Sequence, residues 1–338
     1  MISVSHSPSY RVACVQAAPV YMNLDASIDK AIDIIAAAAA NGARLVAFPE
    51  NFLPGYPWFV WLGSPAWAMQ FMKNYHKQAL IVGSEQYMRL EHAAAQHKIH
   101  LVMGFTEKDG GSLYMSQAII DETGKTIATR RKLKPTLAER LVFGEGDGGD
   151  IAVHDTALGK LGALCCWEHI QPLTKFAMYS QHEQIHVGAW PSFSLYNEVT
   201  PAISGEVNIA VSRTYAVEGQ CFVIAPCAIT PKETVDTLCT TDSHHNLLKS
   251  GGGFARIYGP DGASLATPLS EDEEGILYAD INLDDITMAK ISGDAVGHYS
   301  RNDVTRLIFN RNSLRPVHQK GQPIFGDDEI IPQKDENV

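Results

Sequence analysis

The run Ala43–Phe48 is a continuous apolar segment of strand length, and it ends at Pro49-Glu50. A strand with one face in water alternates apolar and polar residues, whereas a strand covered on both faces does not. The missing alternation therefore predicts a strand with packed layers on both sides. Glu50 is expected to emerge at the end of that strand.

Helical and strand patterns follow one another along the rest of the chain. Leu24–Ala40 has apolar residues at helical spacing and ends at Asn41-Gly42, which predicts a helix. Further helices are predicted at Ser84–Gln96, at Leu173–Gln181 and within Val199–Glu218. The predicted strands are Arg11–Ala17, Ile99–Thr106, Leu113–Ile120, Lys125–Lys132, Ile151–His154, Leu161–Cys165, Ile185–Ala189, Cys221–Ala225, Phe254–Tyr258, Ser264–Thr267 and Ile276–Ile281.

Strands joined both by helices and by turns favour an α+β fold in which sheets pack face to face with helices outside. No repeat of fixed period and no low-complexity linker divides the chain. We therefore predict a single domain over residues 1–285. Residues 286–338 are more polar and contain proline, and they are predicted to form a C-terminal arm that contacts another subunit or a disordered tail.

The stretch Phe52–Met72 contains no charged residue and is long enough to span a bilayer. Its prolines and glycines interrupt a helical pattern, and it holds three of the five tryptophans. We expect it to be a buried, loop-rich aromatic lining of a pocket or of a subunit contact rather than a membrane span.

Charge excludes some classes of partner. The 27 Lys and Arg residues against 38 Asp and Glu residues give a net charge of -11, which repels nucleic acid and anionic membranes. The first residues show no basic region followed by an apolar run, so we expect no secretory signal and a cytoplasmic location. The six cysteines are then expected to be thiols.

Two motifs fit common cofactor and metal sites poorly. Gly144–Gly149 has the spacing of a dinucleotide loop, but strand-like residues follow it and it carries two carboxylates, so we reject a nucleotide site. His244-His245 is predicted to lie in a solvated polar loop, and no His-Glu-x-x-His pair or cysteine cluster is present. No cofactor and no metal are expected.

A candidate nucleophile follows the predicted strand Leu161–Cys165, where the chain continues as Cys166-Trp167-Glu168-His169 and Pro172 opens a helix. A side chain on such a turn lies near the positive end of the next helix, which favours a thiolate. A free cysteine considered alone is more often a small buried hydrophobe. Glu50 and the basic stretch Arg130–Arg140, each considered alone, are equally compatible with structural or solvated roles.

Considered together, three segments resemble the catalytic motifs of the nitrilase superfamily, in the order of that family: Phe48–Glu50, Arg131–Thr136 with Glu139, and Cys165–His169. Further stretches are similar to the nitrilase branch itself. These are Leu53–Pro57, Phe143–Gly148, Ala189–Phe193 and Gly297–Arg301, and the resemblance spans about Arg11 to Asn310.

The resemblance implies a four-layer α-β-β-α sandwich and a Glu-Lys-Cys catalytic set. By motif position, Cys166 is the nucleophile and Glu50 the general base. Lys132 is the catalytic lysine, and Glu139 is a second carboxylate that orients or assists it.

Neighbours of the same residue type and two departures from the family pattern accompany this set. Cys165 and Lys134 adjoin the expected nucleophile and lysine. Leu137 stands where many relatives carry histidine, and Asn51 where a small residue or threonine is common. Both departures are expected to influence pocket shape and substrate choice.

The implied activity is hydrolysis of an arylaceto- or aliphatic nitrile to the carboxylic acid and ammonia, through a thioimidate and a thioester on cysteine. Tyr56, Trp167 and Trp190 are expected to bind substrate, with Trp58 nearby, whereas Phe193 is equally compatible with core packing. A cyanide hydratase or an amidase of the same superfamily is the enzymatic alternative. A catalytically silent assembly scaffold is the alternative from another class.

The resemblance also implies a homodimer that assembles into larger oligomers such as spiral filaments.

Overall fold

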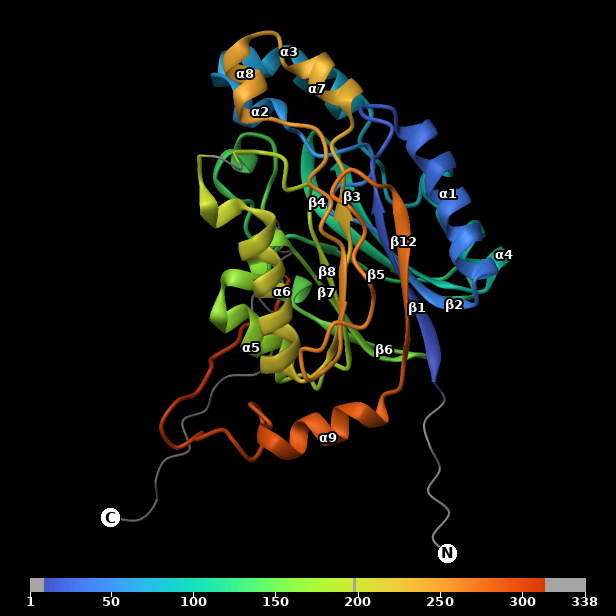
Figure 1. The fold of residues 1–338 in the computed structure, drawn as a ribbon, viewed down its shortest axis with the longest axis vertical. Coiled ribbons are helices and arrows are strands. Elements are labelled where there is room, and N and C mark those ends of the chain that lie inside the picture. The colour runs from blue at the N-terminus through green and yellow to red at the C-terminus, as the bar shows by residue number, and fades with distance from the viewer. Residues whose placement is uncertain (1–8, 197–198, 314–338) are drawn as a thin grey trace, which may run out of the picture.

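The computed structural model describes residues 9–196 and 199–313. Two β-sheets lie face to face, and helices cover the outer face of each sheet (Figure 1). This arrangement is the four-layer α-β-β-α sandwich, so the predicted α+β fold class is confirmed.

The first sheet has seven strands in the order β10-β1-β2-β3-β4-β5, with β12 paired to β1. The neighbours β1, β2 and β3 are parallel, whereas β3, β4 and β5 form an antiparallel meander. Its strands are β1 (Tyr10–Ala17), β2 (Ala43–Ala47), β3 (His100–Asp109), β4 (Ser112–Ile120), β5 (Thr126–Arg131), β10 (Cys227–Ala228) and β12 (Gly275–Ile281).

The second sheet has five strands in the order β11-β9-β8-β7-β6. Its three central strands are parallel, and the two edge strands pair antiparallel. Its strands are β6 (Val153–Thr156), β7 (Gly159–Cys165), β8 (Ile185–Ala189), β9 (Phe222–Ala225) and β11 (Arg256–Tyr258).

Two helix pairs form the outer layers (Figure 1). The helices α1 (Leu24–Ala40) and α4 (Glu85–His97) cover the first sheet, and α5 (Pro172–Tyr179) and α6 (Gly205–Gly219) cover the second. Helix α1 begins where the Asn23 side chain accepts a hydrogen bond from the Ala26 backbone N–H. It ends before Gly42, whose φ of 80° favours glycine.

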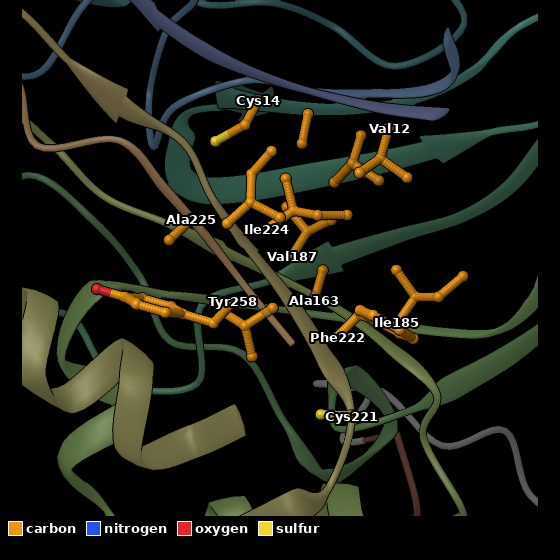
Figure 2. Close-up of a cluster of buried hydrophobic side chains, with 14 of the residues drawn as sticks. Val12, Cys14, Ala163, Ile185, Val187, Cys221, Phe222, Ile224, Ala225 and Tyr258 are labelled. Carbon is orange, nitrogen blue, oxygen red and sulfur yellow. The ribbon is translucent and has the colours of Figure 1, made fainter. Parts of the chain in front are cut away.

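Strand β2 explains why its apolar run does not alternate. Leu45 and Ala47 pack into the core between the two sheets, whereas Val46 packs into the core beneath α1 and α4. Both faces of the strand are therefore covered, as predicted. Figure 2 shows the core between the sheets, with Val12 and Cys14 from β1 and Ala163, Val187 and Ile224 from the second sheet.

The charge-free stretch Phe52–Met72 is only partly the predicted buried loop. It contains α2 (Phe59–Leu62) and most of α3 (Pro65–Lys77), in which Met69 is 65% exposed. Ser64 caps α3 by accepting from the Trp67 backbone N–H, and Pro65 lies in its first turn. The proline that was interpreted as a helix breaker therefore starts a helix. No helix within residues 9–196 and 199–313 is both long and apolar enough to cross a membrane.

Other differences lie at chain connections. The predicted strand Ser264–Thr267 is reduced to one bridge between Tyr258 and Ser264, and β12 pairs with β1 rather than closing a hairpin. The helices α7 (Lys232–Leu238), α8 (Asp242–Leu247) and α9 (Asp284–Gly293) were not predicted. His244 and His245 lie in α8 rather than in a loop. The His244 ring is half-buried, with its centroid 4.8 Å from that of Trp67, whereas His245 is exposed as predicted.

The start of the segment predicted as an arm lies within α9. Farther along, Arg311 donates to Gln181 at 2.8 Å and Ser313 donates to Asp147 at 3.0 Å, so this part of the chain returns to its own domain. The remainder of the predicted arm or tail, residues 314–338, lies outside the described residues.

Candidate active site

Glu50, Lys132 and Cys166 each follow the end of a strand. Lys132 comes directly after β5 and Cys166 directly after β7, and Glu50 lies three residues beyond β2. The Glu50 backbone N–H donates to the Trp190 carbonyl at 3.3 Å, which joins the end of β2 to the end of β8 in the opposite sheet. Strand ends of both sheets therefore meet at this point.

The Lys132 ammonium lies between two carboxylates. Its Nζ is 2.9 Å from Glu50 Oε1 and 2.8 Å from Glu139 Oε2. All three side chains are at most 1% exposed. One buried cation therefore faces two buried acids, an arrangement that shifts proton affinities strongly.

The charges of this cluster explain its pKa values. Burial raises the pKa of Glu50 to about 8; Lys132 opposes this rise and Glu139 adds to it. Burial alone would lower the pKa of Lys132, but Glu139 and Glu50 hold it well above its ordinary value. A single ammonium balances only one carboxylate, so the cluster readily retains a proton near neutral pH.

Glu139 is held by the chain around it. Its Oε1 accepts from the Tyr56 hydroxyl at 2.6 Å, and its Oε2 accepts from the Thr136 backbone N–H at 2.5 Å. Glu139 lies in the short 3₁₀ helix 137–141, where it forms a capping box with Thr136. Both of its oxygens are therefore fixed by hydrogen bonds.

Cys166 lies on a strained turn. Its φ is 47°, in the left-handed region that residues other than glycine rarely adopt, and it is 8% exposed. Burial raises the pKa of the Cys166 thiol well above its usual value; Glu50 raises it further and Lys132 opposes this. Burial therefore opposes the thiolate that was expected at this turn.

The neighbouring cysteine and lysine lie elsewhere. Cys165 is 1% exposed, and its sulfur is 4.0 Å from the guanidinium of Arg130. The Lys134 side chain is 58% exposed and forms an ion pair with Glu145. Neither residue lines the pocket that contains Cys166.

Glu168 fastens the turn of Cys166 to the loop of Lys132. It accepts from Arg130 at 2.6 Å, from the Leu133 backbone N–H at 2.8 Å and from the Cys165 backbone N–H at 2.7 Å. Burial would raise its pKa, but the Arg130 guanidinium and these donors lower it below the ordinary value. The ionised carboxylate therefore ties the two sheets together beside the site.

A chain of buried polar groups extends from the backbone of Cys166. His169 Nδ1 is 2.6 Å from the Cys166 carbonyl oxygen, and its Nε2 is 2.8 Å from His186 Nε2. His186 Nδ1 is 2.7 Å from Glu183 Oε1, and the Tyr215 hydroxyl donates to Glu183 Oε2 at 2.6 Å. Sequence reasoning missed Glu183, His186 and Tyr215. The single signal was a histidine inside the apolar strand β8.

The hydrogen-bond partners in this series of polar groups determine which atoms carry hydrogens. A carbonyl only accepts, so His169 Nδ1 carries a hydrogen and its Nε2 accepts from His186 Nε2–H. Burial and the neighbouring His186 lower the pKa of His169 to about 3, which keeps it neutral. One further proton must lie between His186 Nδ1 and Glu183. Burial raises the pKa of Glu183 to about 8, so this proton is retained at neutral pH.

We expect His169 to be a positioning residue for the nucleophile. The variant His169→Asn removes the bond to the Cys166 carbonyl and leaves the His186 donor without its partner. We expect kcat to fall about 10- to 100-fold with KM changed less than about threefold, because the turn shifts while the pocket remains. The free energy of unfolding should fall by about 1–3 kcal/mol. Steady-state kinetics and chemical denaturation measure both.

The matched control is His92→Asn, because His92 is exposed on α4. It should leave both quantities unchanged. A His169→Asn enzyme that is less stable but retains the native kcat would show a role in folding only.

A pocket lined mainly by apolar side chains adjoins the cluster. Cys166 and Glu139 line it, and about 50 Å³ within it is open to the centre of a water molecule. Five aromatic side chains form much of its wall: Tyr56, Trp58, Trp61, Trp167 and Phe193. Asn208, which accepts from the Trp167 indole N–H at 3.1 Å, supplies a polar group. Trp61 belongs to the charge-free stretch that was expected to line a pocket, whereas Asn208, on α6, was missed.

Three residues expected near substrate do not line this pocket. Trp190 is 2% exposed; its ring stacks on His169 and its indole N–H donates to Ser212 at 2.9 Å. Leu137 is 69% exposed, and Asn51 is buried on the other side of Glu50. Trp190 therefore supports the turn of Cys166 from behind, because its ring stacks on His169.

Comparison with known proteins identifies similar chains. Residues 11–291 match a family model described as "Carbon-nitrogen hydrolase". A "Nitrilase" of Pseudomonas syringae pv. syringae (strain B728a) is 56% identical over 302 residues, covering 89% of this chain and 90% of that protein. An "Aliphatic nitrilase" of Rhodococcus rhodochrous is 50% identical over 98% of this chain and 90% of its own length. A "Nitrilase, arylacetone-specific" of Alcaligenes faecalis is 47% identical over 92% and 88%.

Solved structures share the fold at lower identity. A carbon-nitrogen hydrolase from Helicobacter pylori G27 superposes with a TM-score of 0.69 at 19% identity, covering 89% of this chain and 100% of that chain. A mutant of the amidase from Nesterenkonia sp. AN1 gives a TM-score of 0.62 at 20% identity, covering 84% and 97%. These likenesses support the four-layer architecture.

Proposed function

The chain belongs to the carbon-nitrogen hydrolase family and to its nitrilase branch, and we propose that it hydrolyses an arylaceto- or aliphatic nitrile to the carboxylic acid and ammonia. The observation that carries this proposal is the 56% identity, over 89% of the chain, to a protein named nitrilase. The geometry supports it, because a lysine between two buried carboxylates adjoins a pocket that contains a cysteine.

In the proposed first step, Glu50 takes the proton of the Cys166 thiol. This base is needed because burial keeps the thiol protonated. The sulfur attacks the nitrile carbon and forms a C–S bond, while one C–N bonding pair moves to nitrogen. Lys132 stabilises the developing negative charge, and Glu50 passes the proton that it took from the thiol to the nitrogen, which gives a neutral thioimidate and an ionised Glu50.

Hydrolysis of the thioimidate completes the proposed cycle. Water adds its hydroxyl to the carbon and gives its other proton to Glu50. The nitrogen takes this proton and the proton of the added hydroxyl, the C–N bond breaks, and ammonia leaves a thioester. A second water adds, the C–S bond breaks, and the thiol regains its proton as the acid departs. If the C–S bond of the first tetrahedral intermediate breaks instead, the product is the amide. The sum is one nitrile and two waters to one acid and one ammonia.

The aromatic pocket supports an aryl or alkyl substituent on the nitrile carbon. Tyr56 and Trp167 are proposed to contact that substituent. Their ring edges and faces provide apolar area without a charged group that would select a polar substrate.

A substrate panel tests the proposal. We expect ammonia release from phenylacetonitrile or from a short aliphatic nitrile, with little amide, and much slower release from cyanide and from the matching amides. Ammonia from amides alone would identify an amidase, and amide formed from cyanide would identify a cyanide hydratase. No ammonia from any of these compounds would favour the assembly scaffold.

The ionisation of Glu50 should make kcat/KM fall as the pH is lowered from about neutral. Only its ionised form accepts the thiol proton, and its folded pKa is raised above the ordinary 4.5 to about 8. We therefore expect kcat/KM to fall about tenfold for each pH unit below about 7.5. Because the pKa of Glu50 is higher in the folded than in the unfolded protein, protonation of Glu50 stabilises the fold. This contribution to stability is fully present below pH 4.5 and is lost as the pH rises towards 8. A kcat/KM that stays flat from pH 5 to 9 would contradict this assignment.

Assembly and location are further parts of the proposal. We propose a homodimer that forms larger spiral oligomers, supported by apolar side chains exposed on the outer helices, such as Leu173 on α5 (62% exposed) and Val217 on α6 (48%). Light scattering coupled to size-exclusion chromatography tests this. We propose a cytoplasmic location because a catalytic cysteine must stay reduced.

A further inference from the structure

One oxygen of Glu50 has no protein partner. Oε1 accepts from Lys132, whereas Oε2 is buried without a hydrogen bond to any described residue. A buried carboxylate oxygen left without a donor is energetically costly. Some polar group other than a described side chain is therefore needed to satisfy it.

Other unsatisfied polar atoms gather at the same place. Both amide atoms of Asn51 and the Thr234 hydroxyl are buried and lack a hydrogen-bond partner among the described residues, and the Tyr21 hydroxyl is buried near them. These three side chains and Glu50 line one small cavity. It offers about 10 Å³ to the centre of a water molecule, close to what one ordered water needs. Such a water requires two to four polar partners, and the cavity supplies that number.

The cavity lies next to the outer surface. An open groove is formed by residues 18–22, Asn74 and the start of α7. Four residues line both the groove and the cavity: Pro19, Tyr21, Pro231 and Thr234. A single layer of side chains therefore separates the cavity from solvent, and the hydroxyl of one of them, Thr234, has no partner among the described residues.

The same cavity is separate from the substrate pocket. Tyr56 and Trp58 line both spaces, and their ring centroids lie 4.4 Å apart, so this aromatic pair forms the partition. Glu50 lines the cavity but not the substrate pocket, whereas Cys166 and Glu139 line the pocket but not the cavity. Glu50 therefore borders the cavity, whereas Cys166 borders the space that the substrate would fill.

We propose that this cavity is a water-binding site and a back entrance, through which water reaches Glu50 from the surface groove past Thr234 and Tyr21. The inference rests on the proposed function. Each turnover consumes two waters, one before the C–N bond breaks and one before the C–S bond breaks. The covalent intermediate occupies the front pocket during both steps. A water bound to Glu50 Oε2 already contacts the base that must take its proton.

The test variant is Thr234→Val, which keeps the side-chain shape and removes the hydroxyl that faces the cavity. Formation of the thioimidate consumes no water, so kcat/KM should stay within about twofold of the native value. The water-consuming steps should slow, so we expect kcat to fall about tenfold with KM falling in parallel. Intact-protein mass spectrometry should then find more of the enzyme as covalent adduct during turnover. Tyr21→Phe, which removes the other hydroxyl, should change kcat and adduct level in the same direction.

The control is Thr237→Val, because Thr237 lies on the same helix and lines the groove but not the cavity. It should behave as the native enzyme. Unchanged kcat and adduct level in Thr234→Val would overturn the proposal. Equal loss of kcat and kcat/KM would also overturn it, because that pattern indicates a misplaced base.

A high-resolution crystal structure of the native enzyme gives a readout that does not depend on activity. We expect a water within hydrogen-bond distance of Glu50 Oε2 and of Asn51 or Thr234. Absence of density there would overturn the proposal even for an active nitrilase. If the native enzyme released no ammonia from nitriles, the proposed function would fail, and the density would still decide whether the cavity binds water.

Discussion

The variant Cys166→Ala should lose essentially all turnover, by at least about 10⁴-fold in kcat, while its fold stays intact. Without the sulfur no covalent intermediate forms, and the remaining residues only polarise a nitrile carbon that water attacks poorly. The side chain is 8% exposed and its removal leaves a small gap on the pocket wall. The free energy of unfolding should therefore change by less than about 1.5 kcal/mol. Ammonia release and chemical denaturation measure the two effects.

Cys165→Ala is the matched control, because it removes the same atom one residue earlier. Cys165 points to Arg130 and away from the pocket, so kcat should stay within about threefold of the native value. Equal loss in both variants would mean that the turn as a whole, rather than the sulfur of Cys166, sustains activity.

The variant Lys132→Met should lose both activity and stability. Two buried carboxylates, each within 3 Å of the ammonium, would face each other without a cation between them. Breaking a buried ion pair from one side costs about 3–5 kcal/mol. Activity should fall by at least about 10³-fold, because the charge that develops on the nitrile nitrogen has no compensating cation.

The loss of stability in Lys132→Met should depend on pH in one direction. Without Lys132 the folded-state pKa of Glu50 rises further, so protonation of Glu50 stabilises the folded variant. The stability deficit should therefore shrink as pH falls towards 5 and grow as pH rises to 8. Lys134→Met, which removes an exposed lysine, should change neither stability nor its pH dependence. A Lys132→Met protein as stable as the native chain at pH 8 would contradict the buried ion-pair cluster.

The hydrophobic periodicity of the sequence predicted the layers, because a strand that is buried on both faces lacks the alternation of apolar and polar residues. The missing alternation of Ala43–Phe48 required cover on both sides, and the structure provides it through α1 and α4 outside and the second sheet inside. The ends of the strands could also be predicted from the sequence, so Glu50, Lys132 and Cys166 were expected at or just after strand ends. The start of α3 was not, because Ser64-Pro65 has the composition of a turn as well as of a capped helix.

The spacing of residues in the sequence could not predict which way the side chains at the site point. Whether Cys165 or Cys166 faces the pocket depends on a φ of 47° at one residue, and periodicity carries no such information. Trp190 was expected at the substrate and instead packs on His169. The chain from His169 to Tyr215 joins residues that only the folded sheet brings together.

The location of the covalent intermediate tests the account most directly. Native enzyme is quenched in acid during turnover of a slow nitrile, and the peptide Leu161–Lys175 is fragmented between Cys165 and Cys166. We expect a thioimidate or thioester mass on Cys166 alone, formed within the time of one turnover. An adduct on Cys165, or steady ammonia release with neither cysteine modified, would contradict it.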